Sequence, residues 1–318
     1  MSFKDIKGQD SAISFLLSSL ANNKVAQSYI FAGSGGVGKM LTAMNFAKAV
    51  NCQGDVKDKP CDACIPCKKI SSSNHPDVSV VKAHKEGSSV GIDDIRELIR
   101  SISLKPYEAR KKFYIIDDAD SMTQEASNAL LKTLEEPVSD SVVIMIVQNI
   151  NFILPTIRSR SQTVKFLPLG IDEVKDFLVK AHGVDELQAR LLSSFSSGSP
   201  GKALKDKDAD FLEKRQRILG AIINKTFFDL EFEKASRTEL KNYLDIILAW
   251  YRDVFVAKAG GVAESFFNID KKDIIMTEAK KADFNKLEDT IRQVLSTYSF
   301  LDTNANPKLA FAVLGFKI

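Results

Sequence analysis

The stretch SYIFAGSGGVGKM, residues 28–40, decides the fold of the first half of this chain. It runs from an apolar strand-like segment through a glycine-rich turn into a helical pattern. In such a turn, glycine N–H groups cradle phosphates and a lysine reaches the outer phosphates. The candidate nucleotide-binding residues are therefore Gly33, Gly36, Gly38 and Lys39, with Met40 beside them.

Met40 interrupts this pattern, which requires serine or threonine after the lysine to place a hydroxyl on Mg²⁺. A thioether suits such a hard cation poorly. Thr42 is no easy substitute, because it lies about 200° further round the helix. Two interpretations stay open: a site that binds ATP or ADP but holds Mg²⁺ weakly, or a turn that no longer binds nucleotide. We expect weak or absent intrinsic ATPase activity.

Apolar segments and helical patterns alternate through residue 168. Strands are predicted at 28–32, 77–81, 112–117, 142–147 and 163–167, with helices near 10–22, 38–51, 92–103 and 122–136. Nearly continuous apolar strands are typical of a sheet covered on both faces. This predicts an α/β fold with a parallel sheet and helices on both sides. We expect the fourth helix to begin with a capping box from Ser121 to Gln124 and to end at Pro137.

The composition changes after residue 168, and the pattern becomes helical. Short helices punctuated by SSGSPG (196–201) predict a small helical lid over 169–206. Long amphipathic segments predict an all-α domain over 207–318. We therefore expect a P-loop domain over 1–168 followed by these two parts.

The overall composition is that of an ordinary globular protein, with 44% hydrophobic and 27% charged residues. The net charge of +3 does not mark a nucleic-acid binder, although a local basic patch remains compatible with it. The sequence contains no run of about 18 apolar residues, and its polar N-terminus does not resemble a signal peptide. We expect a cytoplasmic location.

All four cysteines, Cys52, Cys61, Cys64 and Cys67, lie close together in the sequence. Thiolates at such spacing can surround Zn²⁺ tetrahedrally, and four protein ligands would make the site structural. Two disulfides are an alternative that a reducing compartment disfavours. An iron–sulfur cluster is another, because ferredoxins share part of the spacing. We interpret the nearby His75 and His84 as ordinary loop residues.

A second acidic motif, FYIIDDAD at 113–120, ends another predicted strand. Asp117 has the position of a carboxylate that holds Mg²⁺ through water. Asp118 stands where a longer glutamate usually polarises the attacking water. Since a displacement of about 1 Å can cost about 10²-fold in rate, the shorter side chain predicts slow hydrolysis. The alternative is that both aspartates only cap the following turn.

The order of these motifs resembles the AAA+ clamp-loader subunits of bacterial DNA polymerase III. The most specific segments are CDACIPCKKISSSNHPD at 61–77 and ALLKTLEEP at 129–137. FKDIKGQ, LPTIRSR and GSPGKAL extend the likeness over residues 1–205. The helical remainder is only consistent with the collar domain of that family.

The resemblance assigns a role to Arg160, because Ser159-Arg160 is similar to the Ser-Arg-Cys motif of the family, with Ser161 replacing the cysteine. Arg160 would neutralise charge on a γ-phosphate held by a neighbouring subunit, an effect worth roughly 10³–10⁵ in rate. The alternative is a surface arginine paired with a carboxylate, which is also our interpretation of Arg158.

The resemblance also implies that a polar residue of the pair Gln148-Asn149, which we assign as Asn149, faces a γ-phosphate. It further implies that Lys202 replaces an arginine that contacts phosphate. Lysine would do so as a point charge, with less geometric control. A further departure from the family is Gln27-Ser28, where many relatives have His-Ala.

Met40, Asp118, Lys202 and the length favour the stator branch of the family over its gamma/tau motor branch, which has complete phosphate loops and a long C-terminal extension. A stator would have no polymerase site of its own. It would assemble with gamma/tau and delta to open a sliding clamp and load it onto primer-template DNA, which it would contact through phosphates without sequence readout. The alternatives are a gamma/tau-type motor ATPase and a zinc-bearing scaffold without nucleotide.

Overall fold

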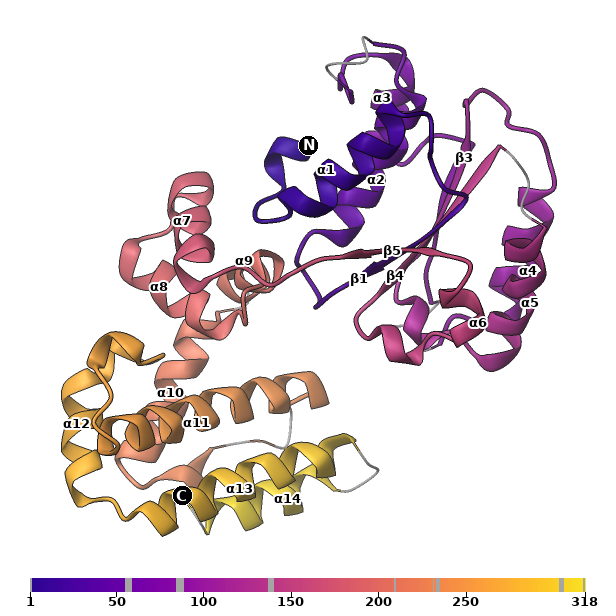
Figure 1. Cartoon of the computed structure of the whole chain (residues 1–318). Coiled ribbons are helices and arrows are strands. Elements are labelled where there is room, and N and C mark those ends of the chain that lie inside the picture. The colour runs from indigo at the N-terminus through magenta and orange to yellow at the C-terminus, as the bar shows by residue number, and fades with distance from the viewer. Residues whose placement is uncertain are drawn as a thin grey trace. The chain divides into compact units, whose positions relative to one another are not determined.

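A computed structural model describes residues 2–54, 59–83, 89–136, 140–208, 210–230, 232, 235–302, 306–316 and 318. His84 and Pro137 lie outside these ranges. The chain forms two compact units, Met1–Glu173 with Gly198–Gly201, and Val174–Ser197 with Lys202–Ile318. Figure 1 shows a sheet covered by helices in the first unit and helices alone in the second.

The first unit is built on a five-stranded parallel sheet of order β2-β3-β4-β1-β5. Its strands are β1 (Ser28–Ala32), β2 (Val78–Val81), β3 (Lys112–Ile116), β4 (Ser141–Val147) and β5 (Gln162–Lys165). The five strands and their parallel direction were predicted from the sequence, and the prediction is confirmed. Since all strands run the same way, the sheet has one carboxyl edge and one amino edge.

Helices cover both faces of this sheet because successive strand residues point to opposite sides. Phe31 of β1 joins a core with Phe46 of α2 (Lys39–Asn51), against which α1 (Asp10–Ala21) also packs. The preceding residue, Ile30, joins the opposite core with Leu130. That core is formed by α4 (Ile92–Ile102), α5 (Gln124–Glu135) and the short α6 (Pro155–Arg158). Figure 1 shows these two helical layers.

The start of α5 differs from the predicted capping box, which is wrong. Ser121 ends a short 3-10 turn, Ala119–Ser121, and does not cap the helix. Thr123 is the cap residue instead, and its side chain accepts a hydrogen bond from the Ala126 N–H at 3.2 Å. The extra turn that follows β3 moves the start of the helix by two residues.

The described residues of the second unit form helices and turns. Its helices are α7 (Ile171–His182, which begins in the first unit), α8 (Glu186–Phe195), α9 (Pro200–Asp208), α10 (Phe211–Ile223), α11 (Arg237–Lys258), α12 (Lys272–Lys281), α13 (Phe284–Asp302) and α14 (Pro307–Gly315). Buried Arg215 donates to Asn268 and pairs with Asp270, while buried Asp253 accepts from Asn268. This satisfied network ties α10 to α11 through the segment before α12. None of the described helices is long and apolar enough to span a bilayer.

Candidate functional site

The glycine-rich turn lies at the carboxyl edge of the sheet, between β1 and α2. A Cβ on Gly33 would lie 2.3 Å from the backbone oxygen of Phe166, so only glycine fits there. Gly38 has a φ of 97°, a left-handed conformation that strongly favours glycine. The sequence therefore forms a phosphate-loop backbone for stereochemical reasons that can be traced to individual residues.

Lys39 is buried and folded back onto the loop. Its Nζ donates hydrogen bonds to the backbone oxygens of Gly33 and Ser34, the latter at 2.7 Å. Burial lowers the pKa of Lys39 below its ordinary value, against the opposing charges of three nearby aspartates. The lysine would have to leave both carbonyl oxygens to contact a phosphate.

The residues that follow Lys39 offer no hydroxyl to a cation. Met40 packs against the apolar core below the loop. The Thr42 hydroxyl is fully buried and donates to the Gly38 carbonyl at 2.9 Å. The expected inability of Thr42 to replace a serine or threonine at position 40 thus has a direct structural cause.

The first turn of α9 packs against the phosphate loop. The Gly201 N–H donates to the Gly36 oxygen at 3.0 Å, and a Cβ at position 201 would lie 2.8 Å from that oxygen. Gly198 adopts a φ of 75° beside Leu169. The glycines of SSGSPG therefore permit close backbone approach as well as a turn.

The acidic motif has a third member, to which the sequence alone assigned no role. Asp117 lies 3.6 Å from Lys82, and Asp118 is exposed with a φ of 50°. Asp120 accepts hydrogen bonds from the N–H groups of Gln148 and Asn149, both at 2.9 Å. It therefore joins the end of β4 to the end of β3. The sequence signal that could have indicated this role is the last aspartate of FYIIDDAD, which is Asp120.

At the end of β4, two polar side chains have different surroundings. Asn149 accepts from the Asn151 N–H at 3.0 Å and caps the turn that follows. Gln148 lies beside the phosphate loop, because a Cβ on Gly35 would be 3.8 Å from its amide oxygen. Of the Gln148-Asn149 pair, Gln148 is therefore the residue beside the loop and the better candidate for contacting a phosphate, while the role of Asn149 remains a prediction.

The four cysteines converge between the end of α2 and the first turn of α3 (Ile65–Ser71). Their sulfur atoms all lie within 4.8 Å of one another, and none is in a disulfide. Sulfur atoms around a tetrahedral Zn²⁺ would be about 3.8 Å apart, from a Zn–S bond of about 2.3 Å. The N–H groups of Cys64 and Ala63 lower the pKa of the Cys61 thiol to about 6, which favours a thiolate. This cluster could hold a metal ion.

The NHPD segment, residues 74–77, stabilises the region that follows the cysteines. Asp77 accepts hydrogen bonds from three successive N–H groups, those of Tyr107, Glu108 and Ala109, at 2.8–2.9 Å. Buried His75 accepts from the Asp77 N–H through Nδ1 at 3.1 Å, and burial lowers its pKa. The structure thus gives His75 and Asp77 local structural partners.

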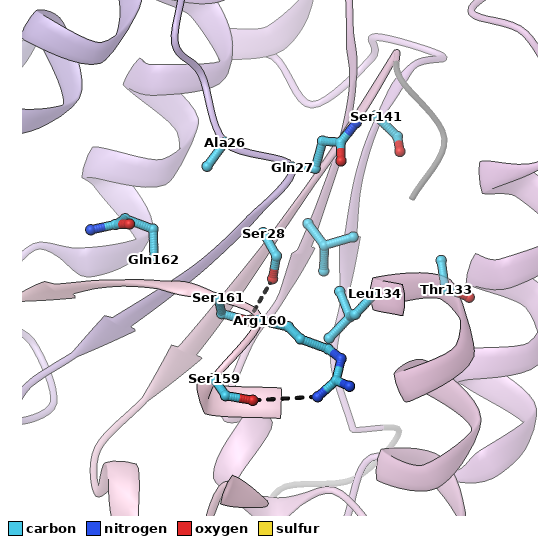
Figure 2. Close-up of a pocket in the computed structure, with 11 residues that line it drawn as sticks. Ala26, Gln27, Ser28, Thr133, Leu134, Ser141, Ser159, Arg160, Ser161 and Gln162 are labelled. Carbon is cyan, nitrogen blue, oxygen red and sulfur yellow. Dashed lines mark hydrogen bonds between the residues drawn. The ribbon is translucent and has the colours of Figure 1, made fainter. Parts of the chain in front are cut away.

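Arg160 lies at the opposite, amino edge of the sheet, two residues before β5. Figure 2 shows it in a hollow whose lining includes Ser28 and Ser141, the first residues of β1 and β4. From Ser28 to Gly33 the chain advances five strand residues, or about 16 Å. The arginine and the chain's own phosphate loop are therefore held at opposite edges.

The guanidinium of Arg160 is exposed and has partners in its own chain. It pairs with Glu135 at 3.1 Å and donates to the Thr156 oxygen at 3.0 Å and to the Ser159 hydroxyl at 3.3 Å. Glu135 is thus the carboxylate partner expected if Arg160 were only a paired surface arginine, which is the alternative interpretation. Exposed pairs of this kind contribute only about 0–1 kcal/mol, so Arg160 can exchange partners.

Two departures from the family pattern, at Ser28 and Ser161, lie in contact. Their hydroxyl oxygens are 2.8 Å apart (Figure 2). Ser161 also donates to the Ile157 oxygen at 2.9 Å. Since that second bond uses the Ser161 proton, Ser28 is the donor between the two serines. The pair ties the start of β1 to the turn that carries Arg160.

Lys202 lies on α9 in the second unit. Its Nζ is 3.6 Å from a carboxylate oxygen of Asp245, which also accepts from the Tyr298 hydroxyl. Burial raises the pKa of the neighbouring Asp206. The proposed contact of Lys202 with phosphate remains a prediction.

The parallel sheet, the phosphate loop with its acidic strand end, and the helical second unit define an AAA+ protein. Residues 8–170 match the family model described as DNA polymerase III, delta subunit. The chain is 30% identical over 311 residues to the DNA polymerase III subunit delta′ of Bacillus subtilis, covering 94% of this chain and 92% of that protein.

Relatives of the motor branch match over less of their length. The tau subunit of Bacillus subtilis is 33% identical over 207 residues, which are 64% of this chain and 36% of tau. The gamma/tau subunit of Mycoplasma pneumoniae is 33% identical over 71% of this chain and 33% of its own length. The chain belongs to the delta-prime family of bacterial DNA polymerase III clamp-loader subunits, which confirms the resemblance and favours its stator branch.

We predict that Asp77→Asn destabilises the first unit by about 1–3 kcal/mol at neutral pH, because hydrogen bonds to a charged acceptor are lost. Burial opposes the charge of Asp77, but its N–H partners outweigh this effect and hold its pKa below the ordinary value. The stabilisation is therefore present at neutral pH and is lost as the pH falls below about 4.

Urea unfolding between pH 7 and pH 3 measures this effect. The gap between wild type and Asp77→Asn is expected to persist to about pH 5 and to close in more acid solution. Asp93→Asn, which alters an exposed carboxylate, is the control. A gap that is independent of pH would show that the charge of Asp77 is not the cause.

Proposed function

We propose that this chain is the stator of a clamp loader and that Arg160 completes an ATP site on a neighbouring subunit. The observation that carries the proposal is the position of Arg160 at the amino edge of the sheet, with the chain's own phosphate loop at the carboxyl edge. An arginine held there is directed away from its own nucleotide site and toward a subunit packed on that edge. Its planar, permanently charged group suits the γ-phosphate oxygens of a bound nucleotide.

The chain's own phosphate loop is proposed to bind nucleotide weakly and to hydrolyse it poorly. Gly33, Gly36 and Gly38 would supply backbone N–H groups, and Lys39 and Gln148 would contact phosphate oxygens. Asp117 and Asp118 would face Mg²⁺ without the usual hydroxyl ligand, and Met40 supports weak Mg²⁺ binding. This arrangement supports a stator more than a motor.

The proposed partners are the gamma/tau and delta subunits, a sliding clamp and primer-template DNA bound through its phosphates. The support is the delta-prime relationship over nearly the whole chain. The three-part division into a P-loop domain, a lid and a collar is also kept as a proposal, with the last part mediating assembly. A cytoplasmic location follows from a role in replication.

We infer that Cys52, Cys61, Cys64 and Cys67 hold a structural Zn²⁺. Four cysteine sulfurs converge in one small space, and N–H groups point at the sulfurs of Cys52 and Cys61. A bound Zn²⁺ would tie the end of α2 to the start of α3. Because all four positions would be taken by protein ligands, no open position would remain for catalysis.

The direct test of the stator role is ATP hydrolysis by a loader reconstituted from this chain with its gamma/tau and delta partners. Arg160→Ala is expected to slow single-turnover hydrolysis at the facing site by about 10³-fold or more. Arg158→Ala, which removes another exposed arginine two residues away, should leave the rate unchanged. Equal rates for wild type and Arg160→Ala would support the scaffold alternative.

ATP hydrolysis by the isolated chain distinguishes the stator from the alternative, a gamma/tau-type motor ATPase. A motor would hydrolyse ATP as the isolated chain and lose this activity in Lys39→Ala. We expect the isolated wild-type chain to be nearly inactive. An isolated chain as active as gamma/tau would contradict the stator assignment.

The pairing of Arg160 with Glu135 gives a further prediction. Glu135→Gln removes an ionic partner worth about 0–1 kcal/mol, so hydrolysis at the facing site should stay the same or rise by up to about fivefold. Quenched-flow measurement on the reconstituted loader gives this rate. A tenfold loss would mean that Glu135 positions the arginine for its work and does not compete with the phosphate.

Metal analysis tests the zinc proposal. The chain purified without added metal is expected to contain one Zn²⁺, and Cys67→Ser should lose it and unfold at a lower temperature. Lys68→Ala, a surface change on the same helix, should keep both metal and stability. Visible absorbance from bound iron, or wild-type stability in a metal-free Cys67→Ser chain, would contradict the proposal.

A further inference from the structure

The surface beside the cysteine cluster concentrates positive charge. Residues 65–74 and 104–112 contain six lysines and arginines and one glutamate, a net charge of +5, although the whole chain has only +3. The other 299 residues therefore carry a net −2. The six cations of these segments are Lys68, Lys69, Lys105, Arg110, Lys111 and Lys112, and we call the solvent-facing part of the two segments the basic surface.

Most of these cations face solvent. Lys68, Lys105 and Arg110 are exposed, and Lys69 and Lys111 are half-buried. Lys112 turns inward to the Ser101 oxygen at 2.6 Å and does not contribute to the surface. The one carboxylate, Glu108, is held by Lys69. The surface that remains is cationic.

Hydrogen bonds and an ion pair bring the two segments together. Lys69 Nζ on α3 lies 2.7 Å from both carboxylate oxygens of Glu108. Asp77 accepts hydrogen bonds from the N–H groups of residues 107–109, and these three bonds fix the backbone of the second segment. Binding a ligand here would need little ordering of the loop.

Tyr107 stands on this fixed backbone with 84% of its surface exposed, more than the other large hydrophobic or aromatic residues of the described chain. A tyrosine usually buries much of its ring and finds a partner for its hydroxyl. Here the backbone is fixed by Asp77 while the side chain is left to solvent, between Lys105 and Arg110 in the sequence. This combination is suited to a ligand with flat faces and negative charges.

We propose that the basic surface binds single-stranded nucleic acid. An unpaired base stacks on the Tyr107 ring, and Lys68, Lys105 and Arg110 contact the flanking phosphates. Aromatic rings on a cationic surface bind single strands in this way without sequence preference, because every base has a stacking face. Duplex DNA fits this surface less well, because its bases have no exposed faces that could stack on Tyr107. An acidic peptide would pair with the lysines and the arginine but would leave the Tyr107 ring unused. The proposal does not depend on Arg160.

Fluorescence anisotropy of a labelled oligo(dT) of about twenty nucleotides with the full chain tests this at low salt. Tyr107→Ala is expected to weaken binding by about fivefold or more, while Tyr107→Phe keeps the stacking face and stays close to wild type. Phe152→Ala is the matched control, because Phe152 is 71% exposed in the same unit and its neighbours from Asn149 to Ile153 carry no charge. It should bind like wild type.

Salt titration distinguishes the contribution of the cations to binding from that of the Tyr107 ring. Lys105→Ala or Arg110→Ala should reduce the slope of log K against log salt by about 0.7 for each phosphate that the replaced cation neutralised, and Tyr107→Ala should leave the slope unchanged. The proposal is overturned if the wild-type chain does not bind oligo(dT), if duplex competes equally, or if Tyr107→Ala and Phe152→Ala bind alike. It is also overturned if Tyr107→Ala weakens only the binding of another loader subunit, which would make the surface a protein interface.

Discussion

The parallel direction of all five strands is the constraint on which this molecule depends. It gives the sheet two different edges, and the chain places a phosphate loop at one and Arg160 at the other. The separation is fixed by buried strands: Ile30 and Phe31 of β1 are fully buried on opposite faces. Ser28 and Ser161 join the start of β1 to the turn that carries the arginine. The position of Arg160 therefore rests on the core of the domain and not on a loose loop.

Much of the fold could be predicted from the sequence because its signals are local. Apolar strands, the glycine-rich turn and closely spaced cysteines are visible as short patterns, and all appear in the structure. The start of α5 was missed, since nothing in the sequence indicates the 3-10 turn that makes Thr123 the cap. The roles of Asp120 and Glu135 were missed for another reason. Each depends on a contact between segments far apart in the chain, and a single sequence does not show which segments meet.

The contacts around the cysteines all stabilise the same surface of the first unit. The four cysteines meet between α2 and α3, Asp77 fixes the backbone of residues 107–109, and Lys69 on α3 pairs with the Glu108 side chain. These contacts stiffen one surface, and they involve none of the side chains that hold Arg160. The NHPD segment therefore serves the local architecture, and the exposed tyrosine it supports is free to meet a ligand.

Glu135 places a carboxylate at the C-terminal end of α5, where the helix dipole disfavours negative charge. Its pairing with Arg160 compensates for that position in the free chain, and a phosphate from a neighbour offers the arginine a stronger partner. A structure of the assembled, nucleotide-bound loader tests this account most directly. The account predicts that the Arg160 guanidinium has left Glu135 and lies within about 2.9 Å of a γ-phosphate oxygen on the adjacent subunit. An arginine still bound to Glu135, with the neighbour's phosphates out of reach, would contradict it.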